Sequence, residues 1–242
     1  MVVDPAGEVV TARETNRLVL VNPAITDQGL RLSAPGVEDL VVERPDNASL
    51  VPVKIWRDRL VARAADPVAG EWFSQFIGRP MRLVYLDDPR RRPVDPDYAE
   101  PGDVVSFADG FPMLLAAEES LAQVNSWIAA GPRAQDGPLP MTRFRPSLVV
   151  AGAAAFAEDD WLRVRIGEVV FRVVKPCGRC VLTTVDPDTA VRTKEPLVSL
   201  GLHRKVGNKV LFAMNLVPER AGPTTRLGTV RIGDEVEVLA AR

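Results

Sequence analysis

The chain is poor in the residues that build several common kinds of functional site. Its 242 residues include two cysteines and a single histidine, His203. Two cysteines cannot form the disulfide framework of a small secreted protein, and one histidine excludes sites built on several imidazoles, such as the H-E-x-x-H zinc motif. No Walker-type phosphate loop and no G-x-G-x-x-G occurs. Nucleotide-fuelled and dinucleotide-dependent reactions therefore lack their usual sequence support.

An excess of one charge and long apolar runs are also lacking. The 30 basic side chains nearly balance 32 acidic ones, which gives no electrostatic footprint for nucleic acid. The longest nearly apolar run, residues 148–157, is far shorter than the roughly 20 residues of a membrane-spanning helix. The first residues have neither the basic nor the apolar region of a secretion signal. We expect a cytoplasmic protein that binds neither nucleic acid nor a membrane.

The residues that are present describe a globular protein rich in β-strands. Hydrophobic residues make up 46% of the chain and charged residues 26%, enough for one large or two small domains. In the first third, a helix is predicted at 67–77, with Asp66 as its cap and Gly78 as its stop. Short β-prone runs separated by turn residues predict strands at 9–11, 18–21, 30–32 and 51–56.

A polar segment, residues 87–102, contains four prolines and is typical of a surface linker. It predicts an N-terminal domain at 1–86 and a C-terminal domain at 103–242. Within it, the triplet Arg90, Arg91 and Arg92 is a candidate anion-binding site. A solvated basic loop is the favoured interpretation, because short charge runs in connectors usually have no dedicated ligand.

The C-terminal part predicts a β-barrel or compact sheet with one or two helices. A helix is expected at 118–130, because Gly131 and Pro132 end the hydrogen-bond ladder. Strands are expected at 148–150, 162–166 and 169–174, and a second hairpin at 229–239. The overall prediction is an α+β, β-rich fold with few helices.

The two cysteines lie together in Cys177-Gly178-Arg179-Cys180, which we expect to form a tight turn between strands at 171–176 and 181–185. In thioredoxin-like proteins such a pair opens a helix, whereas β-branched residues follow it here. A structural zinc site would need four ligands. A Cys–His203 pair is formally possible, although a surface-loop position for His203 is the simpler interpretation.

A further option requires only one thiolate, bound to a soft metal whose other sulfur ligands come from an organic cofactor. Arg179 beside Cys180 favours the thiolate electrostatically. The loop 142–147 offers the guanidinium and hydroxyl groups that a phosphate-bearing cofactor needs. Arg145 in this loop could equally pair with a structural carboxylate.

Several segments, in order along nearly the whole chain, resemble the MOSC family of molybdenum-cofactor proteins, which includes YcbX-like reductases and the mitochondrial amidoxime-reducing components. The fold that this resemblance implies is a MOSC-type β-barrel preceded by an N-terminal β-barrel-like domain. The matching stretches are 10–13 (VTAR), 17–20 (RLVL), 32–34 (LSA), 106–110 (SFADG), 119–122 (ESLA) with Asn125, 144–146 (FRP), 157–159 (AED) with Trp161, and 180–189 (CVLTTVDPDT).

The resemblance also implies the site. Cys180 would be the molybdenum ligand, the pterin dithiolene would supply two further sulfurs, and Asp109 falls at the family's acidic position near the metal. Cys177 would be a bystander. The residues implied to hold the cofactor are Arg145, Ser147, Gly178 and Arg179, in addition to Cys180.

The implied reaction is two-electron oxygen-atom transfer that reduces a small N-hydroxylated substrate. The chain has no flavin or nicotinamide signature and too few cysteines for an iron–sulfur cluster. A separate electron donor, a flavin or iron–sulfur reductase, is therefore expected. The alternative is a non-catalytic cofactor carrier or sulfur-transfer module. No pyridoxal-dependent sulfurase domain fits in this length, so pyridoxal phosphate binding is not expected.

The sequence departs from the family pattern in three places. Ser147 stands where asparagine is common, and Ala190 stands where glycine usually follows the D-P-D-T turn. Family members usually begin with a strand bearing Y-P-V-K-S and a D-R-x-W segment, whereas Met1 aligns just after that tryptophan. The resemblance therefore implies that the first N-terminal strands are missing from this sequence. Two explanations stay open: the true start lies upstream of Met1, or the protein binds the cofactor less tightly and has an exposed barrel edge.

Overall fold

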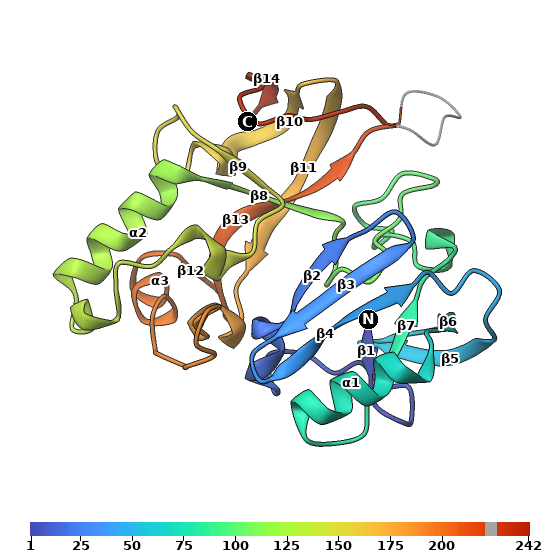
Figure 1. Cartoon of the computed structure of the whole chain (residues 1–242). Helices are drawn as coiled ribbons and strands as arrows, with labels where there is room; N and C mark the ends of the chain where they lie inside the picture. Colours follow the sequence, from blue (N-terminus) through green and yellow to red (C-terminus); the bar gives the residue numbers. More distant parts are fainter. Residues whose placement is uncertain (221–226) are drawn as a thin grey trace. The chain divides into compact units, whose positions relative to one another are not determined.

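The computed structural model describes residues 1–220 and 227–242 and has a β-rich fold with three α-helices (Figure 1). This confirms the predicted fold class. The chain forms two compact units. The first contains residues 1–93, 104–107 and 185–192, and the second contains residues 94–103, 108–184 and 193–242.

The first unit consists of two antiparallel sheets and one helix. One sheet has the strand order β1-β7-β6-β5 and the other β2-β3-β4. The strands are β1 (Val2–Val3), β2 (Asn22–Ile25), β3 (Gly29–Ala34), β4 (Val37–Glu43), β5 (Leu50–Ile55), β6 (Asp58–Ala64) and β7 (Arg82–Tyr85). Helix α1 (Pro67–Ile77) buries Trp72 and Phe73 in a core that also contains Leu32 of β3 and Val42 of β4.

Helix α1 begins and ends where the sequence predicts. The Asp66 side chain accepts a hydrogen bond from the Val68 backbone N–H at 2.9 Å, and Pro67 occupies the first turn. Gly78 ends the helix with φ 84°, a left-handed conformation that glycine adopts at low cost.

Two predicted strands of the first unit do not form. Residues 18–21 fall mainly in a 3₁₀ helix, Asn16–Leu20. Leu18 and Val21 both pack against the core, and a spacing of three suits a helical turn rather than the alternation of a strand. Residues 9–11 contribute only an isolated bridge between Val3 and Val9.

The second unit contains a seven-stranded sheet with the order β14-β10-β11-β13-β8-β9, in which β12 also pairs with β13 (Figure 1). Its strands are β8 (Met113–Ala117), β9 (Leu148–Val150), β10 (Trp161–Ile166), β11 (Val169–Gly178), β12 (Lys205–Val206), β13 (Lys209–Pro218) and β14 (Val236–Ala241). Its helices are α2 (Glu118–Ala130), as predicted, and α3 (Leu197–His203). No helix in the described part of the chain is long and apolar enough to cross a membrane.

Two predictions for the second unit are wrong. The segment 177–180 forms no tight turn between two strands, because Cys177 and Gly178 belong to β11 and a 3₁₀ helix, Val181–Thr184, follows Cys180. The Thr183 N–H and hydroxyl both donate to the Cys180 carbonyl, and the Thr184 hydroxyl donates to the Val181 carbonyl, so local hydrogen bonds replace the ladder of a sheet. The expected hairpin at 229–239 is also absent, because β14 pairs with β10 and residues 229–232 form no strand.

Candidate functional site

The segment that carries both cysteines continues directly from the long strand β11. Gly178 is the last residue of β11 and lies opposite Leu211 of β13, and the Arg179 backbone N–H donates to the Val210 carbonyl at 2.8 Å. Cys177 and Cys180 are free thiols, each half-buried. The two thiols therefore lie at the end of β11, an interior strand of the sheet, in the segment 177–180, which we call the cysteine segment.

The guanidinium of Arg179 joins the cysteine segment to a loop elsewhere in the second unit. Its Nη2 donates to the Phe144 carbonyl at 2.6 Å, and its Nη1 lies 3.1 Å from the Cys177 sulfur. The sequence places Arg179 beside Cys180, whereas the structure places its charged end against Cys177. The contact with Phe144 connects the cysteine segment to the loop that contains Arg145.

The loop with Arg145 begins as the 3₁₀ helix Met141–Phe144 and ends at Arg145, which has the left-handed backbone conformation φ 54°, ψ 47°. The Arg145 side chain is exposed and makes no hydrogen bond or ion pair with any described residue. The Ser147 hydroxyl accepts the Leu114 N–H at 3.2 Å, so its own hydrogen remains available to donate. Two donors of the loop are therefore available to a ligand.

The fold does not require a glycine at position 178. Its φ is not positive, its backbone is exposed, and an added Cβ would approach the Lys209 side chain only to 3.4 Å, close to an ordinary contact. The fold would accept a larger residue here. The absent side chain leaves the backbone between the two cysteines open to a close neighbour.

Asp109 lies in the segment that precedes β8 and is exposed. Two residues later, Phe111 is buried and packs edge-on against Tyr98, with ring centroids 5.6 Å apart. The ammonium of Lys175 lies 4.8 Å from the centroid of the Phe111 ring. These contacts attach the segment of Asp109 to β11, the strand that leads to Cys177.

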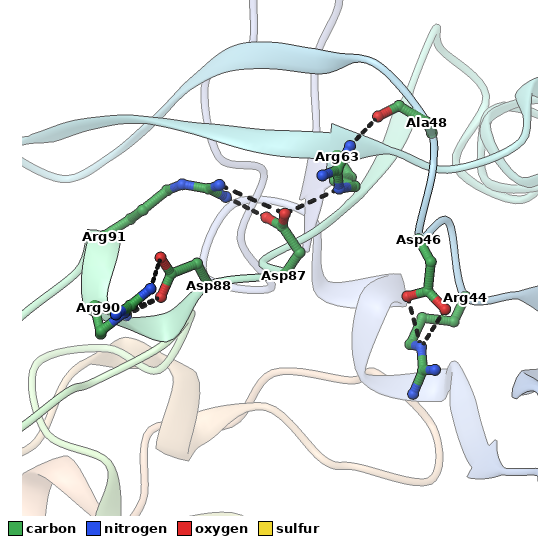
Figure 2. Close-up of polar contacts among 8 residues, drawn as sticks. All are labelled: Arg44, Asp46, Ala48, Arg63, Asp87, Asp88, Arg90 and Arg91. Atoms are coloured by element: carbon green, nitrogen blue, oxygen red, sulfur yellow. Dashed lines mark hydrogen bonds and ion pairs between the residues drawn. The ribbon is translucent and has the colours of Figure 1, made fainter.

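The arginine triplet of the first unit is engaged in ion pairs, of which Figure 2 shows those of Arg90 and Arg91. Arg90 pairs with Asp88 at 2.8 Å, and Arg91 pairs with Asp87, which also accepts from Arg63. The hydrogen bond from Arg91 holds the pKa of the Asp87 carboxyl below its usual value.

The third member of the triplet, Arg92, is almost completely buried and pairs with Asp58 at 2.7 Å. It also donates to the Ser106 carbonyl at 2.8 Å. The triplet is thus neither an anion-binding site nor a freely solvated loop, because a carboxylate pairs with each guanidinium.

His203 is the last residue of α3 and is exposed. Its ring stacks on Trp127 with centroids 4.3 Å apart. None of the contacts found for the described residues joins His203 to a cysteine, so the geometry gives no support to a Cys–His pair.

Glu158, in one of the stretches that carry the family resemblance, is fully buried and accepts the Ser120 hydroxyl hydrogen at 2.9 Å. Burial raises the pKa of this carboxyl. The Ser120 oxygen also accepts the Phe156 N–H at 2.8 Å. This pair connects α2 to the segment before β10, which is a structural role.

Sequence reasoning missed two groups near the cysteines: the Phe144 carbonyl that binds Arg179, and Lys175 with its aromatic neighbours. A backbone carbonyl has no signature in the sequence. The surroundings of Lys175 come from Tyr98 and Phe111, which are far away in the chain.

The sequence of both units matches the models of one known family. A model of the MOSC domain matches residues 102–237, and a model of the MOSC N-terminal beta barrel domain matches residues 1–80. The chain belongs to the MOSC family.

Among its relatives are proteins named mitochondrial amidoxime-reducing components. Component 1 of Homo sapiens is 33% identical, with 99% of this chain and 72% of the relative covered. Component 1 of Mus musculus is 32% identical, with 99% and 71% covered. Component 2 of Rattus norvegicus is 33% identical, with 98% and 71% covered.

Proposed function

We propose that this protein is a molybdenum-cofactor-dependent reductase of N-hydroxylated compounds, with Cys180 as the protein ligand of the metal. The observation that carries the proposal is similarity along 99% of the chain to a protein whose name states that it reduces amidoximes. The half-buried free thiol of Cys180 supports it.

The residues present fit such a cofactor. A thiolate is the kind of soft ligand that suits this metal site. Arg145 offers a guanidinium with no partner among the described residues, and Ser147 retains a hydroxyl hydrogen; both suit a phosphate. Gly178 lets a ligand approach the backbone between the cysteines. Arg179, through the Phe144 carbonyl, would hold the cysteine segment and the Arg145 loop together around one ligand.

When bound, the cofactor supplies two-electron oxygen-atom transfer. The net reaction consumes an N-hydroxylated substrate, two electrons and two protons, and gives the N–H product and water. Asp109 is exposed and can exchange protons with solvent. In the proposed mechanism its carboxyl group would relay a proton from solvent to the N–O group of the substrate.

The electrons must come from outside this chain. Its two cysteines are too few for an iron–sulfur cluster, which is usually held by four thiolates. A separate flavin or iron–sulfur reductase is the proposed donor.

The test compares protein made in a host that synthesises the molybdenum cofactor with protein from a host that does not. With a chemical reductant and a simple aromatic amidoxime, we expect amidine formation in proportion to the molybdenum content, and none from the cofactor-free host. Protein that contains molybdenum but forms no amidine would contradict the proposal and favour a carrier or sulfur-transfer module.

A further inference from the structure

Lys175 is a lysine whose charge is held in place by two aromatic rings. It lies near the end of β11, and its ammonium nitrogen is 4.3 Å from the centroid of the Tyr98 ring and 4.8 Å from that of Phe111. Such contacts attract a cation to the ring faces. The Asn215 side chain donates to the Lys175 carbonyl at 3.3 Å, which fixes the backbone below it.

The ammonium of Lys175 has no counter-ion in the described part of the chain. No carboxylate or other acceptor among the described residues lies within hydrogen-bond distance of Nζ. The residue is half-buried, and Nζ is not sealed from solvent. The two rings attract the ammonium but have no oxygen or nitrogen acceptor facing it. The N–H groups of Lys175 therefore remain available to donate hydrogen bonds to an anion.

Lys175 is joined by short stretches of chain to the residues of the proposed reaction. It precedes Cys177 by two residues, about 7 Å along an extended strand, and Cys180, the proposed metal ligand, by five residues, at most about 18 Å of chain. Phe111, one of the rings that hold it, follows Asp109 by two residues, again at most about 7 Å of chain. Lys175 therefore lies on the strand that ends two residues before Cys180, and its ammonium contacts the segment that carries Asp109.

We infer that Lys175 is a specificity-determining residue that selects N-hydroxylated substrates bearing a carboxylate. This inference rests on the proposed function and narrows its substrate class. A flexible surface lysine would give little discrimination, because holding a long side chain in one geometry costs conformational entropy. Here the Tyr98 and Phe111 rings already restrict the side chain.

The experiment uses two amidoximes of matched size, 4-carboxybenzamidoxime and its neutral 4-carboxamide analogue, with the cofactor-loaded full chain. We expect Lys175→Met to raise KM for the carboxylate compound about tenfold, with kcat and both constants for the carboxamide within about twofold of wild type. Lys175→Arg should restore most of the preference. Added salt should raise KM of the wild type for the carboxylate compound only.

A matched control removes another exposed cation of the second unit. Arg231 follows Thr229 by two residues, and the Thr229 carbonyl accepts the N–H of Glu168, which directly precedes β11 at the end opposite to Lys175. Arg231→Met should leave both KM values unchanged. Thermal melting of each variant checks that the sheet is intact.

A second measurement does not depend on turnover. Calorimetry with 4-carboxybenzamidine, the amidine product, should show about tenfold weaker binding to Lys175→Met than to wild type. Equal KM and Kd values in wild type and Lys175→Met would overturn the role of Lys175. Failure of loaded wild type to reduce either amidoxime would overturn the proposed function, and the binding difference would then show whether Lys175 is an anion site in its own right.

Discussion

The segment Arg90–Arg92 and the loop that contains Arg145 look alike in sequence but differ in structure. Each guanidinium of the first segment faces a carboxylate, as Figure 2 shows for Arg90 and Arg91. Arg145 has no partner among the described residues. An arginine that is already paired stabilises its own loop, whereas one held in an exposed left-handed turn without a partner is available to a ligand. The comparison shows that pairing, rather than local charge, separates a structural arginine from a candidate binding residue.

The largest effect is expected at Arg145. Arg145→Gln should lower the molybdenum and pterin retained after gel filtration by at least about tenfold, because a charge-assisted contact to phosphate is lost. The free energy of unfolding of this variant should not change, since the Arg145 side chain makes no hydrogen bond or ion pair with the described residues. Arg90→Gln is the matched control and should retain the cofactor fully. Equal cofactor loss in both variants would remove the distinction between the two segments.

The opposite result is expected at Arg92. Arg92→Gln should destabilise the fold by about 2 kcal/mol, because it breaks hydrogen bonds of a buried guanidinium to Asp58 and the Ser106 carbonyl. Urea unfolding measures the change. If Arg92→Gln is as stable as wild type, the buried pair is not a structural element.

A smaller effect concerns acid stability. The pKa of Asp87 is lowered, chiefly by the hydrogen bond from Arg91. For a lowered carboxyl pKa, the stabilisation is complete above the unfolded pKa of about 3.9 and is lost as pH falls through the folded value. The stability difference between wild type and Asp87→Asn should therefore shrink below about pH 4. Asp27→Asn, at an exposed position, is the control. If the stability difference between wild type and Asp87→Asn does not depend on pH, the lowered pKa of Asp87 is not its cause.

The smallest effect is expected at Ala190, which, like Arg145, has a left-handed backbone conformation. Ala190 has φ 59°, and its N–H donates to the Asp186 carbonyl at 2.9 Å. A left-handed alanine costs about 1–2 kcal/mol, part of which the greater freedom of glycine in the unfolded chain offsets. Ala190→Gly should stabilise the protein by about 0.5 kcal/mol in thermal unfolding. A loss of stability would show that this turn is not strained.

The sequence predicted correctly those features of the fold, such as the bounds of α1, that depend on residues within one turn of each other. Asp66, Pro67 and Gly78 place α1 because caps and stops act within one turn. The strand expected at 181–185 failed because Thr183 and Thr184 found nearby carbonyls, an outcome that β-propensity does not report.

For the candidate site too, what the sequence predicted differs from what only the structure shows. The resemblance supplied the roles of Cys180 and Arg145, which remain predictions. It did not supply the contact of Arg179 with Phe144 or the position of Lys175 between two rings, because these depend on residues far apart in the chain.

The most direct test of the account is the molybdenum content of two single-cysteine variants made in a host that synthesises the cofactor. Cys180→Ser should purify with less than about a tenth of the wild-type molybdenum per chain, while Cys177→Ser should load as wild type does. Molybdenum in Cys180→Ser at the wild-type level would contradict the assignment of Cys180 as the metal ligand.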